Sequence, residues 1–232
     1  MADVSYQQFC PVSMAAEVLC SRWTIPLLRE LIAGSTRFND LRRDLPRMSP
    51  ALLSKRLKEL ESAGIVQRVA LGAKSDIQEY QLTASGRDLQ GLVDAFGNWG
   101  QKWVETNASL GNLDVNLLMW DMRRNIRTEP MPRQRCIILF SFSELPSARR
   151  KWWLVVNPGM DVDLCSVDPG FDVDLYVNVD LETMTSIWLG YEKVSIAKKQ
   201  QRMRITGNRA IEQAIEQWLG LSPFAKISKI VA

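Results

Sequence analysis

Basic and small polar side chains share one face of the segment from Ser49 to Ser62, and this pattern is suited to contact with DNA. The residues on this face are Ser49, Ala51, Ser54, Lys55, Lys58 and Ser62, with Arg56 at its border. Small residues near the start of a helix allow close approach to base edges, while Lys and Arg reach bases or phosphates. Taken alone, the same face also fits an ordinary solvated helix that carries surface lysines.

Local signals predict that this segment is a helix. Ser49 can accept a hydrogen bond at the N-cap, and Pro50 suits the first helical position because no N–H is needed there. Gly64 predicts a left-handed end. Three leucines recur at helical spacing and predict a buried stripe opposite the basic face; they are Leu53, Leu57 and Leu60.

The neighbouring segments complete the pattern of a winged helix-turn-helix. Residues 24–34 and 37–46 predict two helices, and Leu45 to Ser49 forms the short turn that this motif needs. Residues 65–71 and 77–83 alternate as strands, and the GAKSD turn between them carries Lys74 at the tip of a wing.

Positive charge is concentrated on this region. Between Ser35 and Ser75 there are nine Lys and Arg residues against four acids, an excess of five, whereas the whole chain has a net charge of +3. Neutralising a phosphate backbone requires such a concentration. We therefore predict that Arg37 and Lys74 join the basic face of residues 49–62 in contacting double-stranded DNA.

Catalytic and metal-binding motifs are missing from the sequence. The chain has no histidine, which excludes Ser-His-Asp and Cys-His catalysis and every His-containing metal site. Four cysteines lack C-x-x-C spacing, and no Gly-rich phosphate loop is present; the cysteines are Cys10, Cys20, Cys136 and Cys165. We expect no enzyme activity, no metal and no cofactor.

Several of these segments together resemble the HxlR-type family of bacterial winged-helix regulators. The resemblance covers residues 9–105 and rests on CPV at 10–12, RWTIPLLREL, RFNDLRRDLP, MSPALLSKRLKELESAGIVQR and EYQLTASG. It implies a dimeric repressor or activator that binds a palindromic operator. By the matching positions, the recognition helix is Ser49–Ser62 and the wing lies near Gly72–Asp76.

The family resemblance also draws attention to Cys10, because a cysteine at the CPV position acts as a redox switch in some members. Such a role requires a lowered pKa and exposure. The alternative is a small, inert packing residue. For Cys20, on an apolar helix face, we expect a place in the core.

Residues 84–107 predict one long helix, and the resemblance places it at a homodimer interface. Six apolar residues follow helical spacing along it: Leu89, Leu92, Val93, Phe96, Trp99 and Trp103. Its four glycines weaken the helix, by about 1 kcal/mol each relative to Ala, so packing must stabilise it. The alternative is packing of this stripe within its own subunit.

A polar break at residues 107–112 separates two predicted domains, 1–107 and 113–232. After residue 113 the pattern predicts a helix, several apolar strands and further helices. In residues 172–180, Val173, Leu175, Val177 and Val179 alternate with polar residues, so one face is core and the other solvent. The predicted fold class is α+β: an antiparallel sheet with helices on one face, after the winged helix.

The order of elements in residues 113–222 resembles the sterol-carrier-type lipid-binding fold. Its late signature is a small-residue helix, a short strand ending in Gly and a terminal helix, which IAKKQQRMRITGNRAIEQAI fits. Such folds enclose an apolar tunnel. Large aromatic and Met side chains suit a hydrophobic pocket but are equally natural core fillers; the pocket candidates are Trp120, Trp152, Met184 and Trp188.

Two functions from different classes remain. The first is a DNA-binding transcriptional regulator whose C-terminal domain binds a hydrophobic effector or adds dimer contacts. The second is a lipid or small-molecule carrier whose winged helix mediates protein contacts. No run of about 18 apolar residues and no signal-peptide pattern is present, so we expect a cytoplasmic protein without a membrane partner.

Overall fold

The computed structural model describes residues 5–70, 78–157, 159 and 162–231. They form two compact units, Met1–Gly97 and Asn98–Ala232. Helix α6 (Gln90–Trp103) runs through the division between them. The domain limits expected from the sequence, 1–107 and 113–232, stay predictions.

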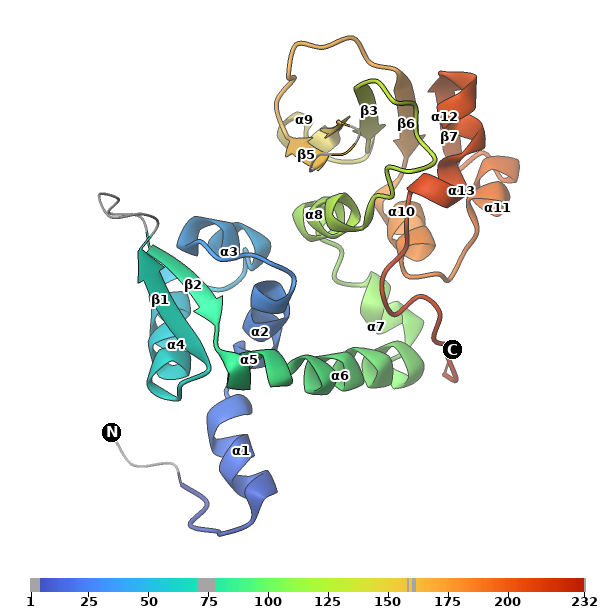
Figure 1. The fold of residues 1–232 in the computed structure, drawn as a ribbon. Coiled ribbons are helices and arrows are strands. Elements are labelled where there is room, and N and C mark those ends of the chain that lie inside the picture. The colour runs from blue at the N-terminus through green and yellow to red at the C-terminus, as the bar shows by residue number, and fades with distance from the viewer. Residues whose placement is uncertain (1–4, 71–77, 158, 160–161, 232) are drawn as a thin grey trace. The chain divides into compact units, whose positions relative to one another are not determined.

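The first unit contains the helices and the two strands that the sequence predicts (Figure 1). In chain order the elements before α6 are α1 (Pro11–Leu19), α2 (Thr24–Ile32), α3 (Phe38–Asp44), α4 (Pro50–Ser62), β1 (Val66–Ala70), β2 (Gln78–Leu82) and α5 (Ala84–Asp88). Strands β1 and β2 are antiparallel, with Val66 opposite Leu82. Apolar residues of α2, α3 and α4 form the core with Val66 and Val93; they include Leu27, Leu28, Leu41, Leu53, Leu57 and Leu60.

The two ends of α4 follow the local signals of the sequence. The Ser49 hydroxyl accepts a hydrogen bond from the Leu52 N–H, and Gly64 adopts φ +69° after the last turn. Thr83 then donates to the Gly64 carbonyl at 2.7 Å and accepts from the Gly86 N–H. A Cβ on Gly86 would lie 2.2 Å from the Ile65 carbonyl oxygen, so the start of α5 requires glycine for close approach.

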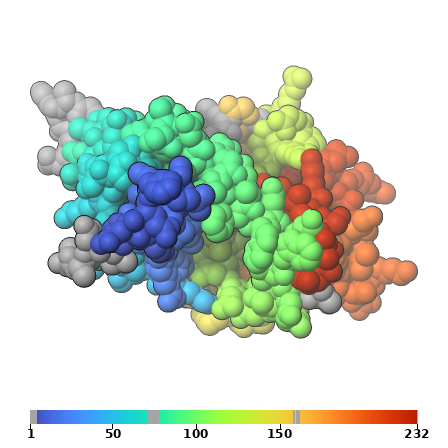
Figure 2. All heavy atoms as spheres, turned by 90° about the horizontal axis from the view of Figure 1, so that it is seen from below, coloured from blue at the N-terminus to red at the C-terminus, as the bar shows by residue number. Residues whose placement is uncertain are grey.

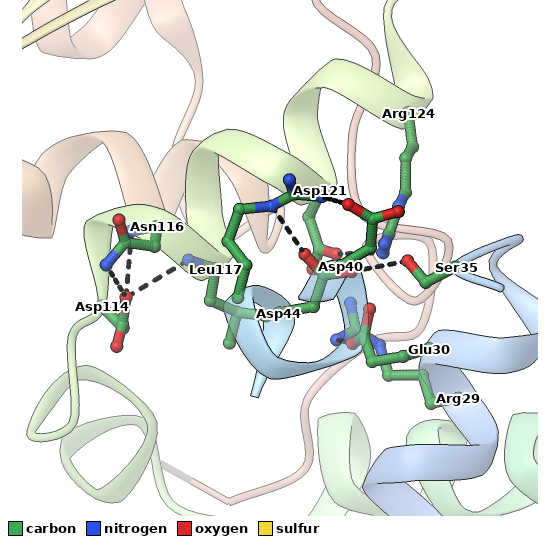
Figure 3. Close-up of polar contacts among 11 residues, drawn as sticks. Arg29, Glu30, Ser35, Asp40, Asp44, Asp114, Asn116, Leu117, Asp121 and Arg124 are labelled. Carbon is green, nitrogen blue, oxygen red and sulfur yellow. Dashed lines mark hydrogen bonds and ion pairs between the residues drawn. The ribbon is translucent and has the colours of Figure 1, made fainter. Parts of the chain in front are cut away.

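Buried carboxylates of the first unit have polar partners (Figure 3). Glu30 of α2 is fully buried beside Arg29, with 2.5 Å between a guanidinium nitrogen and a carboxylate oxygen. The Ser35 hydroxyl donates to Asp44 of α3 over 2.5 Å. An uncompensated buried charge is costly, so these contacts stabilise both carboxylates, and the Ser35–Asp44 hydrogen bond also joins the turn after α2 to α3.

Two expectations about the N-terminal half are wrong: the continuous helix over residues 84–107 and the burial of Cys20. The continuous helix over residues 84–107 is broken at Leu89, where ψ is −9° and the N–H bonds to the Gly86 carbonyl instead of continuing the α-helical pattern. The polar break at 107–112 overlaps α7 (Thr106–Leu110), and its role as a domain boundary stays a prediction. Cys20 is exposed instead of buried because α1 ends at Leu19, which leaves Cys20 at the C-cap.

The second unit is an α+β fold that begins with α8 (Val115–Asn125). Asp114 caps α8 by accepting hydrogen bonds from the N–H groups of Asn116 and Leu117 (Figure 3). The later elements are β3 (Cys136–Ser141), α9 (Ser147–Arg150), β4 (Lys151–Val156), β5 (Val162–Cys165), β6 (Leu175–Val179), α10 (Leu181–Trp188), α11 (Val194–Lys199), β7 (Met203–Gly207), α12 (Arg209–Gln213) and α13 (Ile215–Trp218).

The sheet of this unit is mixed, whereas the sequence predicted an antiparallel one. Its strand order is β5-β4-β3-β6-β7, and the central pair β3–β6 is parallel. A parallel neighbour needs a crossover connection, which β4, β5 and residues 166–174 supply. Strand periodicity carries no information on which strands become neighbours, so the sequence could not reveal this pair.

One face of the sheet packs against the helices α8 and α10 to α13 and forms the main core. Leu175, Val177 and Val179 lie on this face, as their alternation predicted. Val173 does not, because it precedes β6 and packs against a smaller cluster on the other face. That cluster contains Ile137 and Trp153, so the second face is partly apolar and not simply a solvent face.

Candidate nucleic-acid interface

The open face of α4 is the candidate interface. Leu53, Leu57 and Leu60 are buried in the core, which directs the opposite face outward. The outward residues line one groove of about 740 Å³ together with the end of α1; they are Ala51, Ser54, Lys55, Lys58, Glu59, Ser62 and Ala63 on the α4 side. Most of the small and basic residues expected to meet DNA are thus brought together.

The two lysines of this face differ in their contacts. Lys55 is 3.8 Å from the Glu59 carboxylate, and its side chain is more than half exposed. Lys58 is exposed, and within the described ranges no ion pair joins it. Both ammonium groups can therefore reach an external phosphate or base without breaking a buried contact.

Three other predicted residues have structural contacts of their own. Arg56 is largely buried, donates to the Arg22 carbonyl and pairs with Glu59. Arg37 lies 3.4 Å from Glu79 and thereby joins the start of α3 to β2. Ser49 is exposed, with its hydroxyl at the N-cap. Lys74 and the tip of the wing, Gly72–Asp76, lie outside the described residues.

The far wall of the groove comes from residues that the sequence pattern did not indicate. Glu17, Val18 and Ser21 line it from α1 and the turn that follows. The Glu17 carboxylate accepts hydrogen bonds from Ser5 and from the Tyr6 N–H, so it also holds the segment before α1. No periodicity within α4 could reveal these partners, because they lie 29 to 33 residues before Pro50, where α4 begins.

Two other basic residues of the first unit form ion pairs with acidic residues. Arg68 of β1 donates to Glu61 of α4 at 2.9 Å, and this contact raises the pKa of the Arg68 guanidinium above its ordinary value. Arg43 lies 3.0 Å from Asp40 and 3.5 Å from Asp44. Fewer basic side chains of this unit are therefore available to contact DNA than the number of its Lys and Arg residues suggests.

Exposed apolar residues occur on α1 and on α6, and Figure 2 shows α1 at the surface of the molecule. Four exposed residues recur at helical spacing on α6: Leu92, Phe96, Trp99 and Trp103. Leu89 and Val93 of the predicted stripe pack inward instead. The exposed residues around α1 are Phe9, Val12, Met14 and Val18, and Phe9 is 98% exposed.

Cys10 lies at the N-cap of α1 and is only partly buried. Hydrogen bonds from the backbone N–H groups of Ser13, first, and Val12 lower the pKa of the Cys10 thiol below its ordinary value. Burial instead raises the pKa values of the Cys136 and Cys165 thiols. All four cysteines are free thiols.

The predicted pocket residues of the second unit take two kinds of position. Trp152, Met184 and Trp188 are buried in the main core between the sheet and the helices. Trp120 of α8 is half-buried, and the Arg123 guanidinium lies 5.2 Å from its ring centre. Among the residues that the structure describes, no cluster of acids, cysteines or histidines could hold a metal ion, and no helix is long and apolar enough to cross a membrane.

Comparison with known proteins finds similarity in the N-terminal part. A family model described as HxlR-like helix-turn-helix matches residues 18–108. The uncharacterized HTH-type transcriptional regulator YvaP of Bacillus subtilis (strain 168) is 32% identical over 103 residues, which are 44% of this chain and 95% of YvaP. The uncharacterized HTH-type transcriptional regulator sll1512 of Synechocystis sp. is 36% identical over 96 residues, 41% of this chain and 71% of that protein.

A solved structure, that of the redox regulator HypR in its reduced form, is 33% identical in sequence. The match covers 44% of this chain and 96% of that chain, with a TM-score of 0.38. The family match ends at residue 108 and leaves the sheet of the second unit outside it.

Proposed function

This chain belongs to the HxlR-like helix-turn-helix family, and on that premise we propose that it acts as a homodimer that reads a palindromic DNA operator through Ser49–Ser62. Its relatives are transcriptional regulators, so DNA-binding regulation is the function of the family. We further propose which residues contact DNA, which surface forms the dimer and which domain binds an effector.

The observation that carries the proposal is the open face of α4. Small side chains, Ala51 and Ser54, lie near the helix start and allow close approach to base edges. Lys55 and Lys58 follow in the same groove and supply positive charge for bases or phosphates. We assign base and phosphate contacts to these four residues and to Ser49, with Arg37 and Lys74 as phosphate contacts at the edge and wing.

The proposed homodimer uses the exposed apolar residues of α1 and α6. The exposed stripe that includes Phe96, Trp99 and Trp103 has no cover within the described chain. Gln101, on the opposite side of the same helix, is buried and donates to the Leu189 carbonyl at 2.9 Å. Because Gln101 occupies one side of α6, the exposed stripe on the other side is available to a second copy of the chain. Such a dimer would hold its two recognition helices about 34 Å apart, which is one turn of DNA.

Selection from a random DNA pool tests the proposal. The full-length protein should enrich a palindromic duplex, and its affinity for that duplex should fall steeply with salt, since each neutralised phosphate adds about 0.9 to the slope of log K against log salt. Late elution from heparin should accompany this behaviour. Enrichment of no sequence, with early elution, would favour the carrier function in which the winged helix mediates protein contacts.

The C-terminal unit is, in this proposal, a sterol-carrier-like domain that binds a hydrophobic effector. The order α11, β7, α12 supports it, with β7 ending at Gly207. Gly207 has φ +132°, and a Cβ there would lie 2.2 Å from the Asp174 carbonyl oxygen, so this position requires glycine. Trp152, Met184, Trp188 and Trp120 would line the ligand space.

Fluorescence titration with palmitate tests this effector, because the tryptophans named above would report binding. Regulation requires different affinities for the DNA-competent and DNA-incompetent forms, and a tenfold change in operator affinity corresponds to about 1.4 kcal/mol of coupling. Palmitate that leaves both the tryptophan emission and the operator affinity unchanged would remove the effector from the proposal.

Cys10 is the proposed redox switch. Its lowered pKa and its partial exposure at the N-cap of α1 support the assignment. Oxidation of the wild-type protein by diamide should change its operator affinity, and the same treatment of Cys10→Ser should not. An equal response of both proteins would make Cys10 a packing residue.

A further inference from the structure

Helix α1 has little burial to fix its position in the first unit. Of its nine residues, Leu19 alone is buried, and several apolar residues of the helix are exposed. The direction of α1 therefore depends on the short linker, Cys20–Trp23, that joins it to α2. In the proposed function α1 contacts the second subunit. The conformation of this linker therefore affects how the two subunits are arranged in the dimer.

The linker has a constrained backbone at Trp23. This residue has φ +77° and ψ −9°, the left-handed conformation that a bulky side chain rarely adopts. Such a conformation persists only where surrounding contacts determine it. Two contacts are a hydrogen bond from the Thr24 N–H to the Ser21 carbonyl at 3.0 Å and packing of the Trp23 ring against the core.

A third contact comes from the recognition helix itself. The Arg56 Nε donates to the Arg22 carbonyl at 3.1 Å, directly before the strained residue. The guanidinium also pairs with Glu59, one turn along α4. With only 14% of its side chain exposed, Arg56 is held on the linker and is not extended toward the groove that Lys55 and Lys58 line.

We propose that Arg56 is a positioning residue that clasps the α1–α2 linker to the recognition helix and thereby sets the spacing of the two recognition helices. The inference rests on the proposed function, in which α4 reads DNA and α1 contributes to the dimer. It reassigns Arg56, which the sequence placed among the DNA contacts. A Lys at this position keeps the charge but lacks the planar guanidinium, which directs separate N–H groups at the Arg22 carbonyl and at Glu59, so Lys should not reproduce the geometry of both contacts.

The test uses the full-length protein and the duplex that the wild type selects from a random pool. Half-site spacing is varied by one base pair in each direction. Arg56→Lys should lower affinity for the selected duplex about tenfold and reduce the discrimination between spacings, with the salt slope unchanged. A lost phosphate contact would instead lower the slope by about 0.9, and a conservative Lys would largely preserve a phosphate contact.

Hydrogen exchange of residues 20–27 gives a readout that does not depend on DNA. The clasp predicts faster exchange of this segment in Arg56→Lys and Arg56→Ala. Lys58→Ala is the matched control, because it removes a cation from the same helix without touching the linker, and its exchange there should equal that of the wild type. Arg56→Lys also keeps the test usable where the Ala variant fails to fold.

The DNA-binding and hydrogen-exchange measurements separate failure of the clasp from failure of the proposed function. Unchanged spacing discrimination together with wild-type exchange at residues 20–27 would overturn the clasp. A wild type that selects no duplex would refute the proposed function, while the exchange measurement would still confirm or refute the contact between Arg56 and the linker.

Discussion

The tryptophans of α6 and those in the main core around the C-terminal sheet have opposite environments. Trp99 is 63% exposed and Trp103 is 43% exposed, whereas Trp152, Trp188 and Trp218 are all buried. The indole N–H groups of Trp152 and Trp218 donate to the carbonyls of Arg149 and Ile211. The same residue type thus completes a core in one region and forms an open surface in the other.

The two regions therefore differ in how their aromatic residues contribute to stability. The sheet unit buries Trp152, Trp188 and Trp218 between strands and helices of the same chain. Phe9, beside α1, and Phe96 and Trp99, on α6, stay exposed, and exposed apolar residues that recur along one helix face mark interaction sites. We therefore expect substitutions in the two regions to affect different measurements.

Trp218→Ala should cause the largest loss of stability. Trp218 is completely buried, and its indole donates to the Ile211 carbonyl at 2.8 Å. Truncation of a buried Trp costs about 3–5 kcal/mol, through lost burial and the cavity left behind. Denaturant unfolding should show this loss, and a loss below about 1 kcal/mol would mean that the core does not depend on this residue.

Trp99→Glu should weaken the dimer while leaving the fold intact. Central aromatic residues of an interface contribute about 2 kcal/mol or more, so the dimer dissociation constant should rise at least about thirtyfold. Sedimentation velocity measures it. Val167→Glu, which changes another exposed apolar residue outside α1 and α6, is the control and should have no effect. Equal association of both variants would contradict the comparison.

Gly100→Ala should separate folding from association. A Cβ at Gly100 meets no atom within 4 Å in the chain, so Ala should stabilise α6 by about 1 kcal/mol through helix propensity. Because Gly100 lies beside the exposed stripe, the added methyl group should keep a partner helix at a greater distance and weaken the dimer. A higher Tm with unchanged dimer affinity would exclude Gly100 from the interface.

The smallest effect concerns the cysteines. The lowered pKa of Cys10 increases its thiolate fraction at pH 7, whereas burial raises the pKa values of Cys136 and Cys165 and decreases theirs. Iodoacetamide should modify Cys10 before these two, and the Cys10 rate should begin to rise at lower pH. Mass spectrometry at several pH values checks the order, which would be wrong if Cys136 or Cys165 reacted first.

Local features of the first unit could be predicted from the sequence. Ser49, Pro50 and Gly64 define α4 through interactions within a few residues, and the leucine stripe identifies its buried side. The clasp by Arg56 could not be predicted, because its acceptor is a backbone carbonyl 34 residues away. A basic residue on a helix border gives no signal of such a partner.

The second unit shows the same limit at the level of strands. Alternation identified Leu175, Val177 and Val179 as core residues because it depends on one strand alone. The parallel pairing of β3 with β6 depends on a connection across the sheet, which periodicity does not encode. Exposure of Cys20 was missed because it depends on where α1 ends.

The affinity of Lys55→Ala/Lys58→Ala for the selected duplex tests most directly whether the open face of α4 reads DNA. Fluorescence anisotropy should show a loss of about 1–3 kcal/mol for each base contact removed, or a lower salt slope for phosphate contacts. Sedimentation should show an unchanged dimer. Lys193→Ala/Lys199→Ala removes the same charge from exposed positions of the second unit and should bind like the wild type. Unchanged affinity of Lys55→Ala/Lys58→Ala would contradict the account.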